Sequence, residues 1–407
     1  MKVITTETKP IKMWLNEIED GALQQAKNLA NLPFIHKHIA LMPDCHRGFG
    51  MPIGGVMATE GVIIPNAVGV DIGCGLCAVK TSLTEIDTET LKRIVKEIKK
   101  VVPVGFNKHN KTQDYNLMPL CETALDYKDA QDTLFCSYNQ VVSSEFENAL
   151  KSIGTLGGGN HFIEIQKGDD GHIWIMIHSG SRNLGLKVAN YYNDVAKKLN
   201  AKYYSSVPVE HDLAFLPVDS EEGQAYISEM KYCVDYALVN RKLMMERVCN
   251  VFDRFHADGL FFHNIGDRYN DQIDIPHNYA RLENHYGKNV WVHRKGATSA
   301  KKGEIGIIPG SQGTKSYIVE GLGNKLSFNS CSHGAGRVFG RKQAIEELDL
   351  KKEQAILNKQ NIIHSLESVE DLDEATSCYK DISEVMENQK ELTKILVELT
   401  PLAVIKG

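Results

Sequence analysis

The side chains best suited to chemistry in this chain lie in short glycine-rich segments. Asp71 and Cys74 stand three residues apart within Val-Gly-Val-Asp-Ile-Gly-Cys, residues 68–74. The glycines allow a tight turn that directs a carboxylate and a thiolate to one point. A thiolate is a soft ligand that can bridge two metal ions, and a carboxylate suits a hard ion. The pair predicts a metal site; the alternative is a capped turn with a buried structural cysteine.

Three histidines in comparable surroundings extend this set. His161 follows Gly-Gly-Asn, His178 ends an apolar run before Ser-Gly-Ser-Arg, and His277 stands in Pro-His-Asn. Strand ends and the loops after them are common mounting points for ligands, and imidazole nitrogen is a frequent metal ligand. We expect the three to complete the metal site. Taken singly, each also fits a hydrogen-bonded structural histidine.

Cys77 forms a Cys-x-x-Cys pair with Cys74, which also fits a redox dithiol or half of a zinc site. The sequence holds no second such pair, and the strand-then-helix context of a thioredoxin-type motif is missing. We therefore interpret Cys77 as a small buried residue. The nine cysteines are an odd number spread along the chain, which favours reduced thiols and a cytoplasmic location.

His333 lies in Ser-Cys-Ser-His-Gly-Ala-Gly-Arg, where small neighbours leave room for a phosphorylated ligand. Imidazole can attack phosphorus to form a covalent phosphoramidate, and Arg337 can clamp phosphate oxygens with its fork of donors. The segment therefore predicts a nucleophile. A further metal ligand or an ordinary loop histidine are the alternatives.

Residues 309–316, Pro-Gly-Ser-Gln-Gly-Thr-Lys-Ser, have the composition of a phosphate cradle. They are not a Walker A loop, because the Gly-Lys-Ser/Thr ending is absent. The backbone amides and the hydroxyls of Ser311 and Ser316 can still hold a phosphate or a ribose. A surface turn explains the same residues equally well.

Composition frames the protein broadly. The 407 residues are 42% hydrophobic and 24% charged, as in soluble globular proteins. The net charge of −6 gives no overall basic field and argues weakly against a non-specific nucleic-acid coat. No apolar run approaches the roughly 18 residues of a membrane span, and residues 1–12 lack a signal-peptide core. The sequence thus predicts no membrane association.

Hydrophobic periodicity predicts strands at 38–42, 62–65, 161–165, 172–177, 290–293, 305–308 and 316–319. It predicts helices over about 88–102, 184–200, 222–252 and 381–400, and helix with loop over 103–150. Strands and helices alternate irregularly, without a βαβ period, which favours a single α+β domain. We expect one domain over residues 1–407, with a helical excursion at roughly 184–252.

Taken together and in this order, the motifs resemble the RtcB family of RNA-splicing ligases. The resemblance runs from Met-Pro-Asp-Cys-His-Arg-Gly-Phe-Gly at 42–50 to the terminal Lys-Gly. Its most specific blocks are residues 69–75, 158–164, 178–182, 294–297, 308–311 and 332–337. It implies an α+β fold with mixed sheets around a deep metal-binding cleft, and a monomeric enzyme of the kind that uses GTP and two manganese ions.

The resemblance also implies the reaction. Family members join an RNA 3′-phosphate, or a 2′,3′-cyclic phosphate after hydrolysis, to a 5′-hydroxyl, in tRNA splicing or RNA repair and in some cases with archease. His333 would take GMP from GTP and pass it to the RNA 3′-phosphate. The ligand list alone does not select manganese over zinc or cobalt.

Residue roles follow from the same resemblance. Asp71, Cys74 and His161 would hold one manganese, and Cys74, His178 and His277 the other. The catalytic set would be His333, Arg182, Arg337, Lys295 and Asp44. The guanylate-binding set would be Asn160, Glu164, Pro309, Gly310, Ser311, Ser316, His333, Gly334, Ala335, Gly336 and Lys406. Glu164 would accept from the guanine edge and so discriminate against adenine.

Two other functions compete with this interpretation. A metallohydrolase acting on phosphate esters such as cyclic phosphates would use the Asp/Cys/His cluster, but it would leave His333 and the 309–316 loop without a role. A non-catalytic module that binds RNA ends would need neither metal nor GTP. The sequence does not name the physiological RNA.

Overall fold

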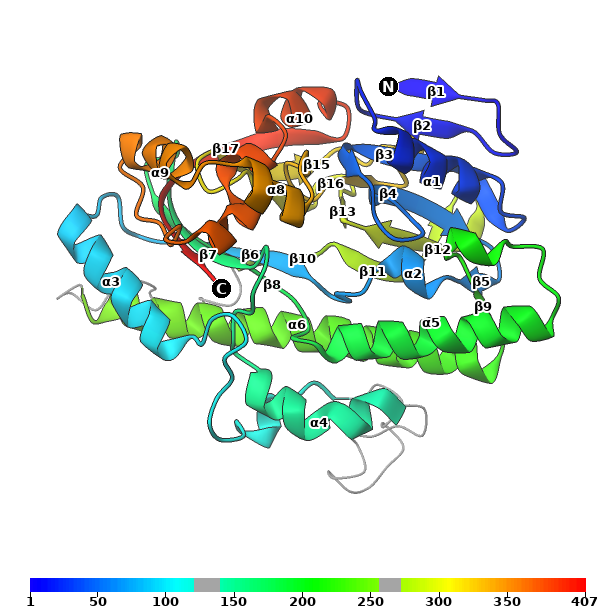
Figure 1. Cartoon of the computed structure of the whole chain (residues 1–407), viewed down its shortest axis with the longest axis horizontal. Coiled ribbons are helices and arrows are strands. Elements are labelled where there is room, and N and C mark those ends of the chain that lie inside the picture. Colours follow the sequence, from blue (N-terminus) through cyan, green and yellow to red (C-terminus); the bar gives the residue numbers. More distant parts are fainter. Residues whose placement is uncertain (121–139, 256–271) are drawn as a thin grey trace.

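A seven-stranded sheet forms the floor of the region where the predicted site residues meet. The computed structural model describes residues 1–120, 140–255 and 272–407 (Figure 1). The strand order is β10-β6-β8-β7-β17-β15-β14, and every neighbouring pair is antiparallel. The strands are β6 (Gly75–Lys80), β7 (Phe162–Gly168), β8 (Ile173–Ser179), β10 (Ile273–Pro276), β14 (Ile305–Ile308), β15 (Ser316–Gly321) and β17 (Thr393–Lys406).

A second sheet has six strands in the order β1-β2-β3-β4-β12-β11. They are β1 (Lys2–Ile4), β2 (Ile11–Met13), β3 (Ile35–His46), β4 (Ile53–Thr59), β11 (Asn278–His285) and β12 (Lys288–Lys295). Two short pairs complete the strands: β5 (Val62–Ile63) with β9 (Leu216–Pro217), and β13 (Ala297–Ser299) with β16 (Ser330–Ser332). Parallel pairing occurs between β2 and β3, so the six-stranded sheet is mixed, whereas the seven-stranded sheet is antiparallel.

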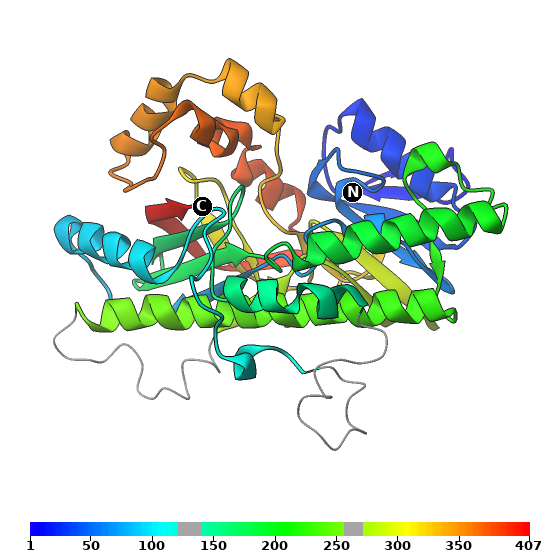
Figure 2. The ribbon, with the colours of Figure 1, turned by 60° about the horizontal axis from the view of Figure 1, so that its bottom comes forward.

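Helices lie on both sides of the sheets, as Figures 1 and 2 show. They are α1 (Asp20–Ala30), α2 (Pro65–Val68), α3 (Thr88–Val101), α4 (Gln140–Ser152), α5 (Leu184–Lys202), α6 (Glu221–Asp253), α8 (Arg341–Glu347), α9 (Leu350–Lys359) and α10 (Ile382–Asn388). Five 3-10 turns are described: η1 (Tyr115–Leu117), η4 (Val209–His211), η5 (Lys325–Ser327), η6 (Val369–Glu374) and η7 (Thr376–Cys378). No helix in these ranges is long and apolar enough to cross a membrane.

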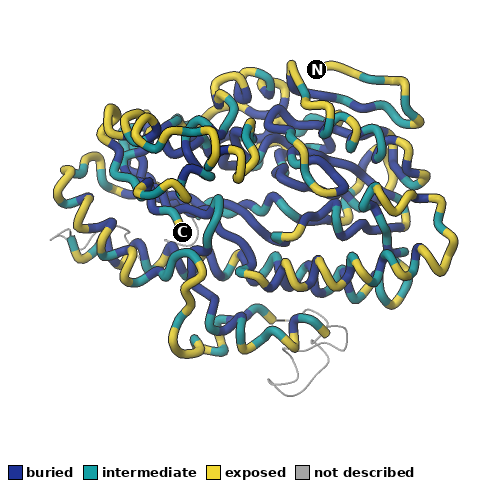
Figure 3. The backbone as a smooth tube through the Cα atoms, in the orientation of Figure 1, coloured by how far each residue is buried: buried dark blue, intermediate teal, exposed yellow. Residues whose placement is uncertain are grey.

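The two faces of the seven-stranded sheet carry different side chains. Ile173, Ile175 and Ile177 of β8 enter an apolar core with α3 and α6. The alternate residues Trp174 and Met176 pack on the opposite face against α8, α9 and η6. Successive side chains of a strand point to opposite faces. In Figure 3 consecutive residues of the central strands are coloured as buried, so both faces of the sheet are covered. The site therefore opens on the α8–α9 face.

Most predicted elements are confirmed. Helix α3 begins after Asp87, whose carboxylate caps the amide of Thr90, and α6 begins after Ser220, which caps Gly223. The strand at 305–308 has the predicted bounds, and those at 38–42, 161–165, 172–177, 290–293 and 316–319 lie in or overlap β3, β7, β8, β12 and β15. The run 62–65 is strand only to Ile63, because Pro65 starts α2.

The segment 184–252 is part of the layered structure. Helix α6 packs on the seven-stranded sheet in the same apolar core as α3, and α5 packs on α6. The described residues thus form one domain of mixed helix and sheet. Within 103–150 the structure has η1, loop and α4, and the part of that prediction at 121–139 lies outside the described residues.

The predicted helix over 381–400 is wrong beyond its first two turns. Helix α10 ends at Asn388, and β17 starts at Thr393. The cause is tertiary: β17 is a central strand that pairs with β15 on one side and β7 on the other. Two full ladders of hydrogen bonds outweigh the helical spacing of Ile395, Leu396 and Leu399, because local propensity is a weak preference.

Candidate active site

Strand parity determines which side chains reach the site. Phe162, Glu164 and His178 share the face that packs against α8 and α9, as does Lys406 at the end of β17. Cys77 has the other parity and enters the core between the sheet and α6. Its thiol therefore lies on the opposite face from Cys74, which supports the interpretation of Cys77 as a buried core residue.

The predicted metal ligands meet at one point. Cys74 Sγ lies 3.5 Å from His161 Nε2 and 3.3 Å from His178 Nε2. His161 Nε2 is 3.2 Å from Asp71 Oδ2, and His178 Nε2 is 3.3 Å from His277 Nε2. Two ligand groups result, Asp71/Cys74/His161 and Cys74/His178/His277, and each keeps its donor atoms within 4.8 Å of one another. Cys74 is common to both groups.

Hydrogen bonds orient two of the imidazoles. His161 Nδ1 lies 2.9 Å from the carbonyl oxygen of Leu156, and His178 Nδ1 lies 2.9 Å from that of Asn160. A carbonyl only accepts, so both Nδ1 atoms carry a proton and both Nε2 atoms face the cluster, where an unprotonated Nε2 can bind metal. Burial lowers the pKa of His178 and of His277 well below the usual range. Neutral imidazoles are the form that binds metal.

The donor set fits divalent ions. His277 Nδ1 is buried and has no hydrogen-bond partner in the part of the chain that the structure describes. Burial, with the charge of Asp71, raises the pKa of the Cys74 thiol well above its usual range. Burial also opposes ionisation of Asp71, but the hydrogen bond and charge of His161 outweigh it and lower the pKa to about 2. A cation between these groups would stabilise the thiolate, which a buried thiol otherwise does not form.

His333 lies next to this cluster, with its ring centroid 4.7 Å from that of His277. Asp44, fully buried on β3, accepts from the main-chain N–H of His333 at 3.1 Å and from its Nδ1 at 2.6 Å. In the neutral imidazole this contact places the proton on Nδ1 and the lone pair on Nε2. The carboxylate thus orients the imidazole as a nucleophile requires.

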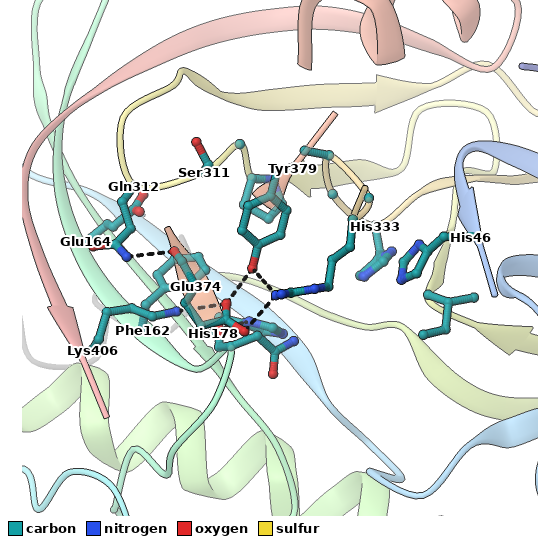
Figure 4. Close-up of a pocket in the computed structure, with 18 of the residues that line it drawn as sticks. His46, Phe162, Glu164, His178, Ser311, Gln312, His333, Glu374, Tyr379 and Lys406 are labelled. Atoms are coloured by element: carbon teal, nitrogen blue, oxygen red, sulfur yellow. Dashed lines mark hydrogen bonds and ion pairs between the residues drawn. The ribbon is translucent and has the colours of Figure 1, made fainter. Parts of the chain in front are cut away.

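A pocket extends from His333 along the sheet (Figure 4). His46 and His333 lie at one end of the view, and Glu164 and Lys406 lie at the other. Ten residues of the expected guanylate set line it: Asn160, Glu164, Pro309, Gly310, Ser311, His333, Gly334, Ala335, Gly336 and Lys406. The eleventh, Ser316, is buried behind it, where its hydroxyl accepts from the amide of Gly310 at 3.2 Å.

Glu164 is a buried acid in this pocket. Burial raises its pKa to about 8, against the opposing charge of Lys406 and a hydrogen bond from Gln166. That bond runs from Gln166 Nε2 to Glu164 Oε2 at 2.6 Å, and the same nitrogen lies 3.1 Å from Ser316 Oγ. Before a ligand binds, Glu164 is therefore largely protonated at neutral pH.

Three residues expected to be catalytic have other partners here. Lys295 donates to the carbonyls of Phe49 at 2.5 Å and Asn66 at 2.9 Å, and burial lowers its pKa to about 7. Arg182 donates to Thr155 Oγ1 at 3.0 Å. Neither lines the pocket. Arg337 does, but its guanidinium is bonded to Glu374 Oε1 at 2.9 Å. Their catalytic roles stay predictions.

Sequence reasoning missed several pocket residues: His46, Phe162, Gln312, Arg341, Glu374 and Tyr379. His46 stands beside Asp44, and Phe162 and Gln312 stand inside motifs that were singled out, so strand parity could have found Phe162. Glu374 and Tyr379 come from the connection between α9 and α10, which carries no motif of its own. Only the tertiary structure brings this connection to the pocket.

The fold and site define a class: a single-domain protein of mixed helix and sheet with a candidate two-ion metal cluster beside an oriented histidine and a polar pocket. The family model described as tRNA-splicing ligase RtcB matches residues 25–407. The chain belongs to the RtcB family.

Named relatives span the whole protein. The RNA-splicing ligase RtcB of Escherichia coli K12 is 38% identical over 414 positions, covering 100% of this chain and 99% of that protein. The tRNA-splicing ligase RtcB of Thermococcus kodakarensis is 32% identical, covering 96% of this chain and 92% of its own length. For the RNA-splicing ligase RtcB of Mycobacterium tuberculosis, identity is 32% and coverage is 94% and 100%.

Proposed function

We propose that this protein is an RNA ligase that joins RNA 3′-phosphate or 2′,3′-cyclic phosphate ends to 5′-hydroxyl ends, using GTP and manganese. The observation that carries the proposal is His333, whose ring is oriented by Asp44 between the ligand cluster and the pocket. A hydrolase needs the cluster alone. A covalent nucleotide carrier needs this histidine as well.

In the first step, His333 Nε2 attacks the α-phosphorus of GTP. A nitrogen–phosphorus bond forms, and the bond from that phosphorus to the bridging oxygen of pyrophosphate breaks. Asp44 stabilises the positive charge that develops on the imidazole, because its carboxylate already accepts from Nδ1. The product is a histidine–GMP adduct, with pyrophosphate as the leaving group.

The pocket residues bind and select the nucleotide in this scheme. Glu164 accepts from the guanine edge, and Lys406 donates to it from the other strand of the β7–β17 pair. Amides and hydroxyls of the 309–316 loop hold ribose or phosphate. Arg182, Arg337 and Lys295 support phosphate groups and the loops that carry the ligands.

Asp71, Cys74 and His161 would hold one divalent ion, and Cys74, His178 and His277 a second. When bound, the ions supply neutralisation of phosphate charge on attacking and leaving oxygens. An oxygen of the RNA 3′-phosphate then attacks the adduct phosphorus, and the bond to His333 breaks. Finally the 5′-hydroxyl attacks the activated RNA end and releases GMP.

We also propose the substrates, the cellular location, the oligomeric state and a partner of this enzyme. The substrates are RNA ends from tRNA splicing or RNA damage. The protein works as a cytoplasmic monomer, with archease as a possible activating partner. The family membership supports RNA as the substrate class.

The test is incubation of metal-loaded protein with α-labelled GTP and manganese, followed by denaturing electrophoresis. We expect label on the wild type and none on His333→Ala. His211→Ala is the matched control, because His211 lies in η4 outside the site, and it should label normally. Absence of label on wild type, with GTP-independent turnover of a cyclic phosphate, would support the metallohydrolase instead. RNA binding indifferent to metal and GTP would support a non-catalytic module.

A further inference from the structure

One buried carboxylate organises the far end of the pocket. Glu374, 3% exposed at the end of η6, contacts three cations and a phenol. Its Oε1 accepts from Arg337 at 2.9 Å and pairs with Arg341 at 3.2 Å. Its Oε2 pairs with Lys406 at 3.3 Å and accepts a short hydrogen bond from the hydroxyl of Tyr379. Figure 4 shows Glu374 between Tyr379 and Lys406.

Glu374 itself is held in place. Gln312 Nε2, from the loop between β14 and β15, donates to the main-chain oxygen of Glu374 at 2.8 Å. Although burial opposes its ionisation, the charges of Lys406, Arg341 and Arg337 lower the pKa of Glu374. The carboxylate is therefore a fixed negative charge whose partners come from separate parts of the chain.

Two of these partners face the space that a ligand would occupy. Lys406 reaches across Phe162, with Nζ 5.7 Å from the ring centroid, to Glu374. Tyr379 is joined to the same carboxylate and also lines the pocket. An ammonium has three donors, so Lys406 can keep its bond to Glu374 and offer another to a ligand acceptor. Without Glu374, both side chains would lose the group that aims them.

We propose that Glu374 is a positioning residue that aims Lys406 at the 6-oxo group of the bound purine and thereby sets selection of guanine over adenine. This inference rests on the proposed function. Guanine carries an acceptor at position 6, whereas adenine carries a donor amino group there. A lysine held by a carboxylate can only donate. A fixed Lys406 therefore forms a hydrogen bond with guanine and leaves the amino group of adenine without an acceptor.

Glu374 and Glu164 then read different edges of the base. Glu164 accepts from the ring N–H and the 2-amino group, whereas Lys406, held by Glu374, donates to the 6-oxo group. Analogues separate the two contacts: inosine triphosphate lacks only the 2-amino group, and 6-thioguanosine triphosphate keeps the ring N–H and the 2-amino group but carries a weakly accepting sulfur in place of the 6-oxo oxygen. Loss of Glu374 should affect discrimination against the second analogue alone.

The experiment measures the rate of histidine adduct formation against concentration for GTP, the two analogues and ATP. For Glu374→Gln we expect the KM for GTP to rise about tenfold to a hundredfold, the loss that accompanies one charge-assisted hydrogen bond. The maximal rate should change little. The preference for GTP over 6-thioguanosine triphosphate should fall towards one, with the preference over inosine triphosphate unchanged.

Asp373→Asn is the matched control. Asp373 is the neighbouring acid, and its side chain pairs with Arg341 at 3.5 Å without a described contact to Lys406. It should leave KM and base preference at wild-type values. In addition, Glu374→Gln combined with Lys406→Ala should have the same base preference as Lys406→Ala alone, because both changes remove the same contact to position 6 of the base.

The outcomes separate this inference from the proposed function. No adduct on wild type with any nucleotide would overturn the proposed function. A normal wild-type adduct, with unchanged KM and base preference in Glu374→Gln, would overturn the role of Glu374. If that variant does not fold, Tyr379→Phe removes only the hydroxyl that donates to Glu374; a severalfold rise in KM is expected, and unchanged kinetics would count against the inference.

Discussion

The two ends of the site are prepared for their ligands in opposite ways. At the metal end, buried imidazoles and a thiol direct their donor atoms towards one another, and His277 Nδ1 has no hydrogen-bond partner among the described residues. At the nucleotide end, a buried carboxylate is already matched by three cations and a hydroxyl. The first end offers a set of donor atoms that cations would complete. The second is a complete hydrogen-bond network that a ligand joins. Substitutions at the metal end should therefore change metal content, and substitutions at the nucleotide end should change GTP binding.

The largest effect is expected from substitution of Cys74, which belongs to both ligand groups. In Cys74→Ala both ligand groups lose their common member, so the protein should lose both equivalents of metal. Adduct formation should fall on the order of a thousandfold or more, since bound metal contributes several kcal/mol of charge stabilisation. Elemental analysis of dialysed protein measures the metal content.

His277→Ala is the companion variant, because His277 belongs to one ligand group only. It should retain about one equivalent of metal by the same logic of ligand count. Equal losses in Cys74→Ala and His277→Ala would contradict the assignment of Cys74 as a shared ligand.

Asp44→Asn should lower the rate of adduct formation by about a hundredfold, since the amide no longer favours a protonated Nδ1 on His333. Metal content and the KM for GTP should stay at wild-type values, because Asp44 contacts neither the ligand cluster nor the far end of the pocket. Single-turnover labelling with GTP measures the rate. A variant with unchanged rate would remove Asp44 from the catalytic set.

A smaller effect, on the pH dependence of GTP affinity, is expected from Glu164. Burial raises the pKa of this acid from 4.5 to about 8. If the ionised carboxylate binds guanine, the acid must first lose its proton. GTP affinity of the metal-loaded protein should then rise about fivefold from pH 7 to 8 and level off above that. Titration of a fluorescent GTP analogue checks this, and Glu164→Gln should be flat over the same range.

Stability should respond to Glu164 in the opposite direction. The folded-state pKa lies above the unfolded one, so the contribution of Glu164 is complete below pH 4.5 and is lost as pH rises through about 8. Denaturant unfolding of wild type and Glu164→Gln at pH 6 and 9 measures the difference. Wild type should lose more stability than the variant between these two values.

The smallest effect on the site is expected from Cys77→Ala. Cys77 is fully buried in the core on the opposite sheet face from Cys74. Metal content and adduct formation should match wild type, and the free energy of unfolding should fall by about 1 kcal/mol for the small cavity. Loss of metal in this variant would revive the dithiol interpretation of Cys74 and Cys77.

Local sequence determined a large part of the fold and of the metal end. The apolar spacing in α3, with an aspartate cap, predicts that helix closely, as does the spacing in α6. The metal ligands were also recognisable, because each stands in its own glycine-flanked or strand-end motif. Features that depend on residue type and short spacing can be predicted from a few neighbouring residues of the sequence.

The elements that failed depend on partners far along the chain. Residues 393–400 have helical spacing yet form strand β17, because β7 and β15 offer hydrogen bonds on both edges. Lys295 and Arg182, expected in the catalytic set, bond to main-chain and hydroxyl groups of neighbouring loops in this structure, and their catalytic roles stay predictions. No local pattern reports such long-range pairing.

The sequence by itself predicted the residues that gather in the ligand cluster, the histidine beside it and the family to which the chain belongs. Only the tertiary structure decided that Cys77 faces away from the site, that Asp44 orients His333, and that Glu374 joins Lys406 to Tyr379. The physical reason is that side-chain identity is a local property of the chain. The partner that fixes a proton, a charge or a strand edge is set by residues brought together only when the sheets and helices pack.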